Sequence, residues 1–169
     1  MDLTDLRAQQ APLKQRYLDQ PESAITPVHG AASLDSPGVS VAVDTWAGPV
    51  RAGLHRATGG DGSDACSGDM LMEALAACAG VTLRSVALAM RIEIRSGTVR
   101  AEGSFDARGT LGVAKDVPVG CTGVHIRAEL ATDADPSQLA RLAELSERYC
   151  VVGQSLASPP VIVVRRLTP

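Results

Sequence analysis

The spacing of apolar residues predicts one long, unusually apolar helix in the middle of the chain. Residues 70–83 are small or apolar apart from Glu73, and with their flanks they predict a helix of about 22 residues that ends at Met90. Ser67 is a suitable N-cap, and Asp69 lies in the first turn, where the helix dipole favours an acid. Because the helix is apolar nearly all round, we expect a partner subunit to complete its burial.

Two further segments have helical spacing. Residues 3 to about 20 carry leucines at helical intervals, with Pro12 as a kink or a restart. Asp135, Pro136 and Gln138 supply a cap, a first-position proline and a capping-box glutamine in order, so a helix is predicted to start there. The residues expected to share one face of this helix are Leu139, Leu142, Ala143, Ser146 and Tyr149.

Alternation of apolar and polar residues predicts the strands. VSVAVDT and VRAGLHRA, joined by the turn WAGP, indicate a hairpin over residues 39–57. Residues 91–108 indicate one long bent strand or two short ones, and residues 123–133 and 160–167 indicate two more. A hairpin, a long helix, strands, a helix and a strand, in that order, favour an α+β domain over a doubly wound sheet.

Composition and charge limit the architecture and the partners. We divide the 169 residues into a helical arm and linker at 1–37 and a single folded domain at 38–169. With 45% hydrophobic but only 2% aromatic residues, the core must consist of Ala, Val, Leu and Ile. The net charge of -3 is interspersed, so we expect neither nucleic acid nor a membrane surface as a partner. The polar start MDLTDLRAQQ lacks a signal pattern, which predicts a cytoplasmic protein, and residues 70–83 are too short for a membrane span.

The polar residues offer no convincing metal or phosphate site. The four cysteines include no C-x-x-C pair and have no close histidine partner, which is poor spacing for zinc. The glycine-rich loop at 58–69 lacks a lysine, its acids would repel a phosphate, and its spacing is not that of a calcium loop. His29, His55 and His125 lie in three separate segments. We interpret His125 as structural, whereas His55 could face a site.

Two cysteines occur beside helical segments. Cys78 lies within ALAACAGVTL, where it shares a helix face with Ala74 and Val81, so it could be a small core residue. Cys150 precedes VVGQSL, a short helical pattern, and a thiolate is favoured near a helix start. One deep cysteine and one at a helix start are what a peroxidatic and resolving pair requires, provided that folding brings them together.

Three segments resemble the OsmC/Ohr family of bacterial thiol peroxidases. They are SGDMLMEALAACAGVTLRSVA (67–87), VPVGCTGVHIRAEL (117–130) and RYCVVGQSL (148–156), within a similarity that runs from about residue 39 to 167. The resemblance implies an intertwined homodimer with two long central helices wrapped by antiparallel sheets. It also implies that Cys78 attacks organic hydroperoxides, that Cys150 resolves the product to a disulfide, and that an external dithiol such as lipoamide reduces it, with no bound cofactor.

The chain departs from the family pattern near the predicted site. Gly68 stands where the family has a glutamate that holds an arginine, and Val151 replaces the usual proline after the resolving cysteine. For the activating cation we choose Arg51, with Arg56 as second choice. Cys66 and Cys121 have no counterpart in the pairing, and we interpret Cys121 as a packing residue.

Two alternatives to a peroxidase remain open at this point. The missing carboxylate at Gly68 favours a non-catalytic dimer that binds an apolar small molecule between its central helices. A redox sensor would form the same disulfide and pass the signal to a partner.

Overall fold

The computed structural model describes residues 3–167, and the chain divides into two compact units between Ala31 and Ala32. The first unit holds helix α1 (Leu3–Asp19) and a single 3-10 turn, η1 (Pro21–Ala24). The predicted N-terminal helix is therefore present, and it continues through Pro12 instead of restarting there. Two residues of the predicted linker, Ala32 and Ser33, form strand β1 of the second unit.

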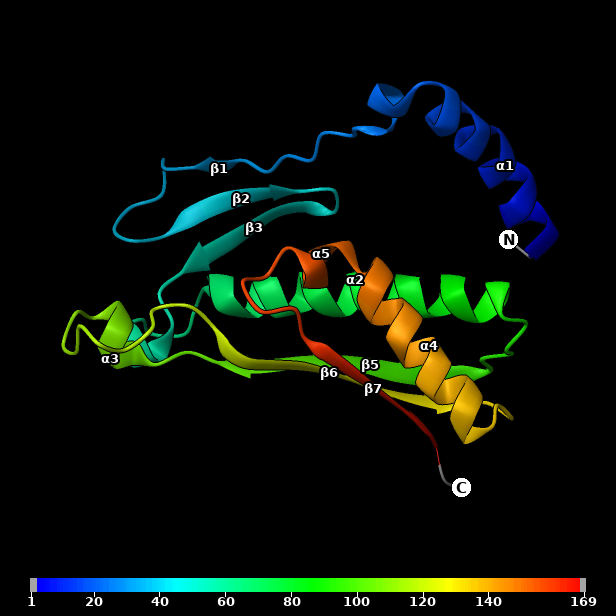
Figure 1. Ribbon diagram of the computed structural model, residues 1–169. Helices are drawn as coiled ribbons and strands as arrows, with labels where there is room; N and C mark the ends of the chain where they lie inside the picture. Colours follow the sequence, from blue (N-terminus) through cyan, green and yellow to red (C-terminus); the bar gives the residue numbers. More distant parts are fainter. Residues whose placement is uncertain (1–2, 168–169) are drawn as a thin grey trace. The chain divides into compact units, whose positions relative to one another are not determined.

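The second unit is an α+β fold with two mixed sheets (Figure 1). The first has the order β1-β2-β3-β4, with bounds β1 (Ala32–Ser33), β2 (Val41–Thr45), β3 (Gly48–Gly53) and β4 (Ala65–Cys66). The second has the order β5-β6-β7, with bounds β5 (Ser96–Ser104), β6 (Thr122–Ala131) and β7 (Val161–Arg166). Pairs β3–β4 and β6–β7 are parallel, so the expectation of purely antiparallel sheets is wrong.

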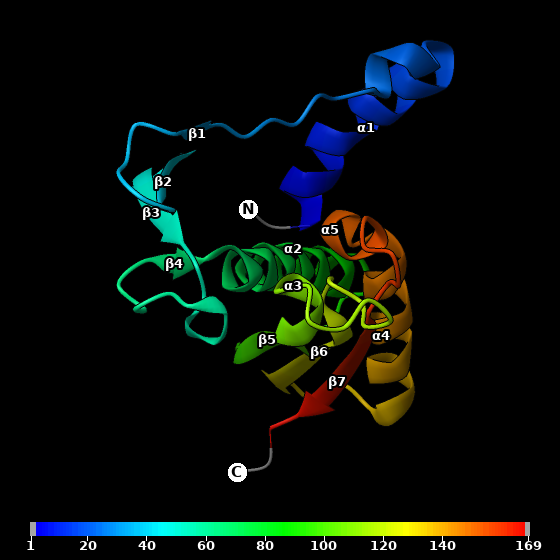
Figure 2. The same cartoon turned by 90° about the vertical axis from the view of Figure 1, so that its left-hand side faces the viewer.

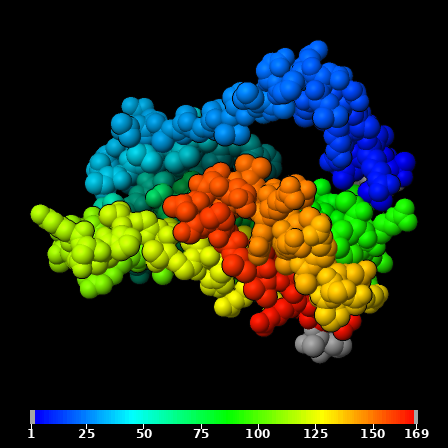
Figure 3. All heavy atoms as spheres, viewed as in Figure 1, coloured from blue at the N-terminus to red at the C-terminus, as the bar shows by residue number. Residues whose placement is uncertain are grey.

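The parallel pair β6–β7 follows from the helices between these strands, because parallel neighbours need a long crossover. The helical segments of this unit are η2 (Arg56–Thr58), α2 (Ser67–Ala89), α3 (Ala107–Thr110), α4 (Pro136–Tyr149) and α5 (Val151–Gln154). Helices α4 and α5 supply the crossover, and α4 packs against β7. On one face of the unit, α4, α5 and β7 lie side by side (Figure 3).

Helix α2 lies along the second sheet and packs against β5, α4 and α5 (Figures 1 and 2). Its buried residues Leu75, Ala79, Leu83 and Ala87 recur every fourth position, which places them on one stripe. Away from this stripe Val81 is 72% exposed, so a single chain covers the apolar helix on one side only. By length and hydropathy alone α2 could cross a membrane, but here its stripe packs into the protein core.

The ends of α2 differ from the simplest interpretation of the sequence. The N-cap is Cys66 and Ser67 is the first helical residue, so the predicted cap is one position off. At the other end Arg91 has a φ of 59°, and the Ile92 amide donates to the Ala87 carbonyl at 2.8 Å. This is a Schellman-type ending, and it turns the chain before a strand can begin. Consequently β5 starts at Ser96 and not at Arg91.

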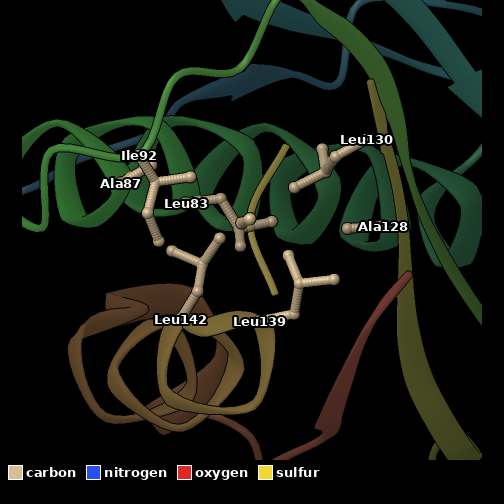
Figure 4. Close-up of a cluster of buried hydrophobic side chains, with 8 residues drawn as sticks. Leu83, Ala87, Ile92, Ala128, Leu130, Leu139 and Leu142 are labelled. Carbon is tan, nitrogen blue, oxygen red and sulfur yellow. The ribbon is translucent and has the colours of Figure 1, made fainter. Parts of the chain in front are cut away.

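The main core joins α2, β6 and α4 (Figure 4). Its buried members are Leu83, Ala87, Ile92, Ala128, Leu130, Ala134, Leu139 and Leu142. Leu139, Leu142 and Ser146 confirm the predicted inner face of α4. Tyr149 does not share it, since it is 56% exposed at the last turn.

The capping box makes the stability of α4 depend on pH. The Asp135 carboxylate accepts a hydrogen bond from the Gln138 amide at 2.9 Å, and the Gln138 side chain accepts one from the Asp135 amide. Hydrogen bonds from Ser137 and from the Gln138 amide hold the pKa of Asp135 below its usual value. The stabilisation is therefore present above the unfolded-state pKa of about 4 and is lost as the pH falls through the lower folded-state pKa.

We expect Asp135→Ala to lower the melting temperature at pH 7, because it removes the cap. Asp135→Asn retains an acceptor oxygen but no charge, so it serves as the matched control. Thermal unfolding from pH 7 to pH 2 should show that the advantage of Asp135 over asparagine disappears in acid. An advantage that persists at pH 2 would contradict the assignment.

Candidate redox site

Folding brings Cys78 and Cys150 together. Cys78 lies near the middle of α2, and Cys150 is the single residue between α4 and α5. Cys150 is 1% exposed within a second apolar cluster whose other buried members are Leu75, Ala79, Ile126 and Ile162. Cys78 packs against that cluster, and each of the two thiols influences the pKa of the other. Both thiols are free.

The surroundings of Cys78 favour its thiolate. Burial by itself raises the pKa of this thiol, because desolvation disfavours the charged form. Hydrogen bonds outweigh that effect and hold the pKa of Cys78 below its usual value. The donors are the amide of Val152, the side chain of Cys150, the amide of Val151 and the hydroxyl of Thr82.

The pKa of Cys150 moves the other way. Burial raises it most, and the neighbouring Cys78 sulfur raises it further, whereas the Gly153 amide lowers it. The opposite directions of the two shifts mean that Cys78 gives up its proton at a lower pH than Cys150 does. This is the division of roles that a nucleophilic and a resolving thiol need.

Local structure fixes Cys150 in this position. It ends α4 and caps α5, and its sulfur accepts a hydrogen bond from the Gly153 amide at 3.4 Å. A Cβ atom at Gly153 would lie only 3.3 Å from that sulfur, so glycine permits the close approach. The Glu147 carboxylate accepts a hydrogen bond from the Ile162 amide at 2.6 Å, which ties the end of α4 to β7. The prediction that Cys150 lies at a helix start is confirmed.

The predicted cation, Arg51, is engaged by an acid of the glycine-rich loop. Its guanidinium pairs with Asp64, which also accepts a hydrogen bond from Ser40. The Arg51 side chain is 62% exposed whereas that of Asp64 is 9% exposed. The ion pair therefore links the glycine-rich loop to β3 at the surface. The second choice, Arg56, lies against Gly62, whose φ of 81° requires glycine. Within residues 3–167, neither arginine is among the main influences on the pKa of the Cys78 thiol.

The other two cysteines line one cavity of about 250 Å³. Its walls include Cys66, Cys121, Met72 and His55, and the His55 ring lies edge-on to Phe105 at a centroid distance of 5.4 Å. Cys121 is thus only half-buried and faces a cavity, which differs from a simple packing residue. His55, which was expected to be able to face a site, therefore lines a cavity together with these two cysteines.

His125 makes local polar contacts of the kind expected for a structural residue. One ring nitrogen of His125 lies 2.9 Å from the Gly123 carbonyl and the other lies 3.2 Å from the Glu102 carboxylate. Among residues 3–167 the structure groups no three His, Cys, Asp or Glu side chains as metal ligands.

The sequence interpretation missed the donors that surround Cys78. Thr82 is four residues after Cys78, which is the spacing of neighbours on a helix surface, so this contact could have been found. The amides of Val151 and Val152 carry no side-chain signal. The replacement of proline by Val151 was the available clue, because valine retains an amide hydrogen that proline lacks.

The fold and the site define a class: an α+β protein with a pair of neighbouring thiols, one on a long apolar helix and one at the start of a short helix packed against it. A family model described as OsmC-like protein matches residues 60–165, and the chain belongs to this family. No curated protein matches the chain.

Solved structures agree with the fold. An OsmC-like protein from Mycoplasma pneumoniae has a TM-score of 0.65 at 17% identity, over 84% of this chain and 96% of that one. An OsmC-like protein of unknown function from Vibrio cholerae has a TM-score of 0.66 at 13% identity, over 85% of this chain and 100% of that one. The organic hydroperoxide resistance protein OhrB of Bacillus subtilis has a TM-score of 0.57 at 15% identity, over 85% and 100%.

Proposed function

We propose that this protein is a thiol-dependent peroxidase that reduces organic hydroperoxides through Cys78 and Cys150. The observation that carries the proposal is that folding packs the two thiols into one apolar cluster, where the pKa is lowered at Cys78 and raised at Cys150. Membership of the OsmC-like family and the likeness to a hydroperoxide resistance protein support the same reaction.

The reaction balances with the residues at hand and two external reactants. The Cys78 thiolate attacks one oxygen of the hydroperoxide, the O–O bond breaks, and the departing alkoxide takes a proton to become an alcohol. Cys78 is then a sulfenic acid. The Cys150 sulfur attacks it, an S–S bond forms, and the hydroxyl leaves as water with the proton of the Cys150 thiol. A dithiol such as lipoamide supplies two electrons and two protons that restore both thiols, so no bound cofactor is needed.

The surroundings of the thiols favour an apolar hydroperoxide. Met72, Leu75 and Ala79 belong to the cluster around Cys78 and Cys150, so an alkyl group meets hydrocarbon near the reacting sulfur. Arg51 remains our candidate for an activating cation. Because Asp64 holds its guanidinium, activation by Arg51 requires that ion pair to be shared or released.

We further propose that two copies of the chain assemble through α2 and that the protein acts in the cytoplasm. A single chain buries one stripe of α2 and leaves Val81 72% exposed. An apolar cavity of about 330 Å³ lies between this open side and β5, lined in part by Ala77, Gly80 and Val99. A second α2 would cover both, as the family's central helix pair implies.

Disulfide mapping tests the proposed reaction. We expect reduced protein mixed with one equivalent of cumene hydroperoxide to form a Cys78–Cys150 bond, found by peptide mass spectrometry, and to release one equivalent of cumyl alcohol. Turnover should continue only with a dithiol present. Alcohol release without this disulfide, or a disulfide that excludes Cys78, would contradict the assignment.

The 330 Å³ cavity also favours a second candidate function, the binding of an apolar small molecule. In that case hydrophobic ligands should raise the melting temperature of the Cys78→Ser variant, and the wild-type protein should not consume peroxide.

A further inference from the structure

Two thiols that the proposed reaction does not use line the cavity of about 250 Å³. Cys66 ends β4 of the first sheet and caps α2, whereas Cys121 immediately precedes β6 of the second sheet. The two residues lie far apart in the chain, so only folding brings them to one cavity. Both thiols are free and half-buried, which leaves them open to a small molecule that enters this space.

The sulfur of Cys66 is uncovered on one side because residue 68, which also lines the cavity, is glycine. A Cβ atom built at Gly68 would lie 3.5 Å from this sulfur, and within residues 3–167 it would meet no other side chain within 4 Å. Packing within the chain therefore does not require glycine at this position. What the glycine leaves open is space beside a thiol.

The other walls of the cavity suit a small sulfur compound that carries no negative charge. Met72 and Phe105 supply a thioether and an aromatic ring, both of which make favourable contacts with sulfur compounds. The Ala57 amide donates to Nδ1 of His55 at 3.0 Å, so Nε2 is the ring nitrogen left for a ligand. Asp69 adds a carboxylate, and among the described residues no lysine or arginine lines the cavity.

The pair of thiols fits redox exchange better than metal binding. Over residues 3–167 no third His, Cys, Asp or Glu joins them in a metal-binding group. A bond between the two sulfurs requires them to approach each other, and the adjoining segments allow such movement. Residues 59–64, before β4, and residues 111–121, before β6, contain neither helix nor strand.

We propose that Cys66 and Cys121 form a second dithiol centre, separate from Cys78 and Cys150, which reduces small uncharged or cationic organic disulfides. The Cys66 thiolate attacks R–S–S–R, the S–S bond breaks, and R–S⁻ leaves and takes up the proton that the thiol released. Cys121 attacks the mixed disulfide, so a Cys66–Cys121 bond forms and a second R–SH leaves. The protein thus gives up two electrons and two protons, which the organic disulfide gains. The new bond joins the two sheets across the cavity.

Disulfide mapping in a chain that contains only this pair tests the proposal. Because the sequence has four cysteines, the full-length Cys78→Ser/Cys150→Ser variant retains only Cys66 and Cys121. We expect this reduced variant, treated with the cationic disulfide cystamine, to form a Cys66–Cys121 bond within one chain and to release two equivalents of cysteamine. Adding Cys121→Ser should stop the reaction at a mixed disulfide on Cys66, with one equivalent released. Since Cys78 is absent, the result is independent of the proposed peroxidase function.

The walls of the cavity give two further arms in the same variant. Asp69→Asn should lower the ratio of the rates with cystamine and with the dicarboxylate dithiodipropionate roughly threefold, because it removes a charge near the reacting sulfur. Gly68→Leu fills the space beside the Cys66 sulfur and should lose most of the reaction. Gly68→Ala is the matched control, since its Cβ makes only an ordinary contact with that sulfur.

Several outcomes would overturn the inference. Mixed disulfides on both cysteines without a Cys66–Cys121 bond would do so, as would a bond that joins two chains. Equal rates in Gly68→Leu and Gly68→Ala would show that the cavity does not admit the disulfide. Circular dichroism checks that each variant is folded, and the Asp69→Asn arm decides the matter if Gly68→Leu is not. An unchanged ratio of rates in Asp69→Asn would contradict the assigned preference for charge.

Discussion

Replacement of Cys78 by serine is expected to abolish the consumption of organic hydroperoxide. A serine hydroxyl stays protonated at neutral pH and cannot form the sulfenic acid on which the cycle depends. Because serine is nearly isosteric with cysteine, the cluster around Leu75 and Ile162 should keep its packing. The measurement is dithiol-dependent loss of cumene hydroperoxide, which should fall to the rate without protein.

Cys150→Ser is the matched control, since it removes the partner but not the attacking sulfur. We expect a single burst of alcohol release, followed by trapping of Cys78 as sulfenic or sulfinic acid, which mass spectrometry detects. Sustained turnover in Cys78→Ser, or a Cys150→Ser variant that releases no alcohol, would contradict the assigned roles.

The elements that depend on local pattern were predictable from the sequence. The apolar run predicted α2, the capping residues from Asp135 predicted α4, and the alternation over residues 39–57 predicted the β2–β3 hairpin. The errors occurred where tertiary contacts decide. Arg91 takes a left-handed conformation with no glycine to signal it, and the parallel pairing of β3 with β4 depends on where a long loop returns.

The site was predictable in its parts but not in its geometry. Helical context singled out Cys78 and Cys150, yet they are 72 positions apart in the chain, and only packing brings their sulfurs together. No periodicity could reveal that backbone amides lower the pKa of Cys78, because every residue except proline carries the same amide. Nor could it reveal the engagement of Arg51 by Asp64, since the pairing depends on how the glycine-rich loop folds back.

The second large expected effect is a loss of stability when the core between α2, which carries Cys78, and α4, which ends at Cys150, is weakened. Leu142 is fully buried, and it meets Leu83 of α2 from the facing side of α4 (Figure 4). We expect Leu142→Ala to lower the free energy of unfolding by about 2–5 kcal/mol, because the lost methyl groups leave a cavity. For a chain of this size that corresponds to a drop in melting temperature of roughly 5–15 °C, measured by circular dichroism.

The consequence of Leu142→Ala should extend to Cys150, because α4 carries that residue at its end. If α4 loosens from α2, the Val151 and Val152 amides, which lower the pKa of Cys78, move with α4. The pKa of Cys78 should then rise, and its alkylation by iodoacetamide at pH 7 should slow even while the protein stays folded. Leu111→Ala is the control, since Leu111 is 57% exposed in a loop and its truncation should change neither stability nor reactivity. A Leu142→Ala protein as stable as Leu111→Ala would show that the contact between α2 and α4 does not hold the site together.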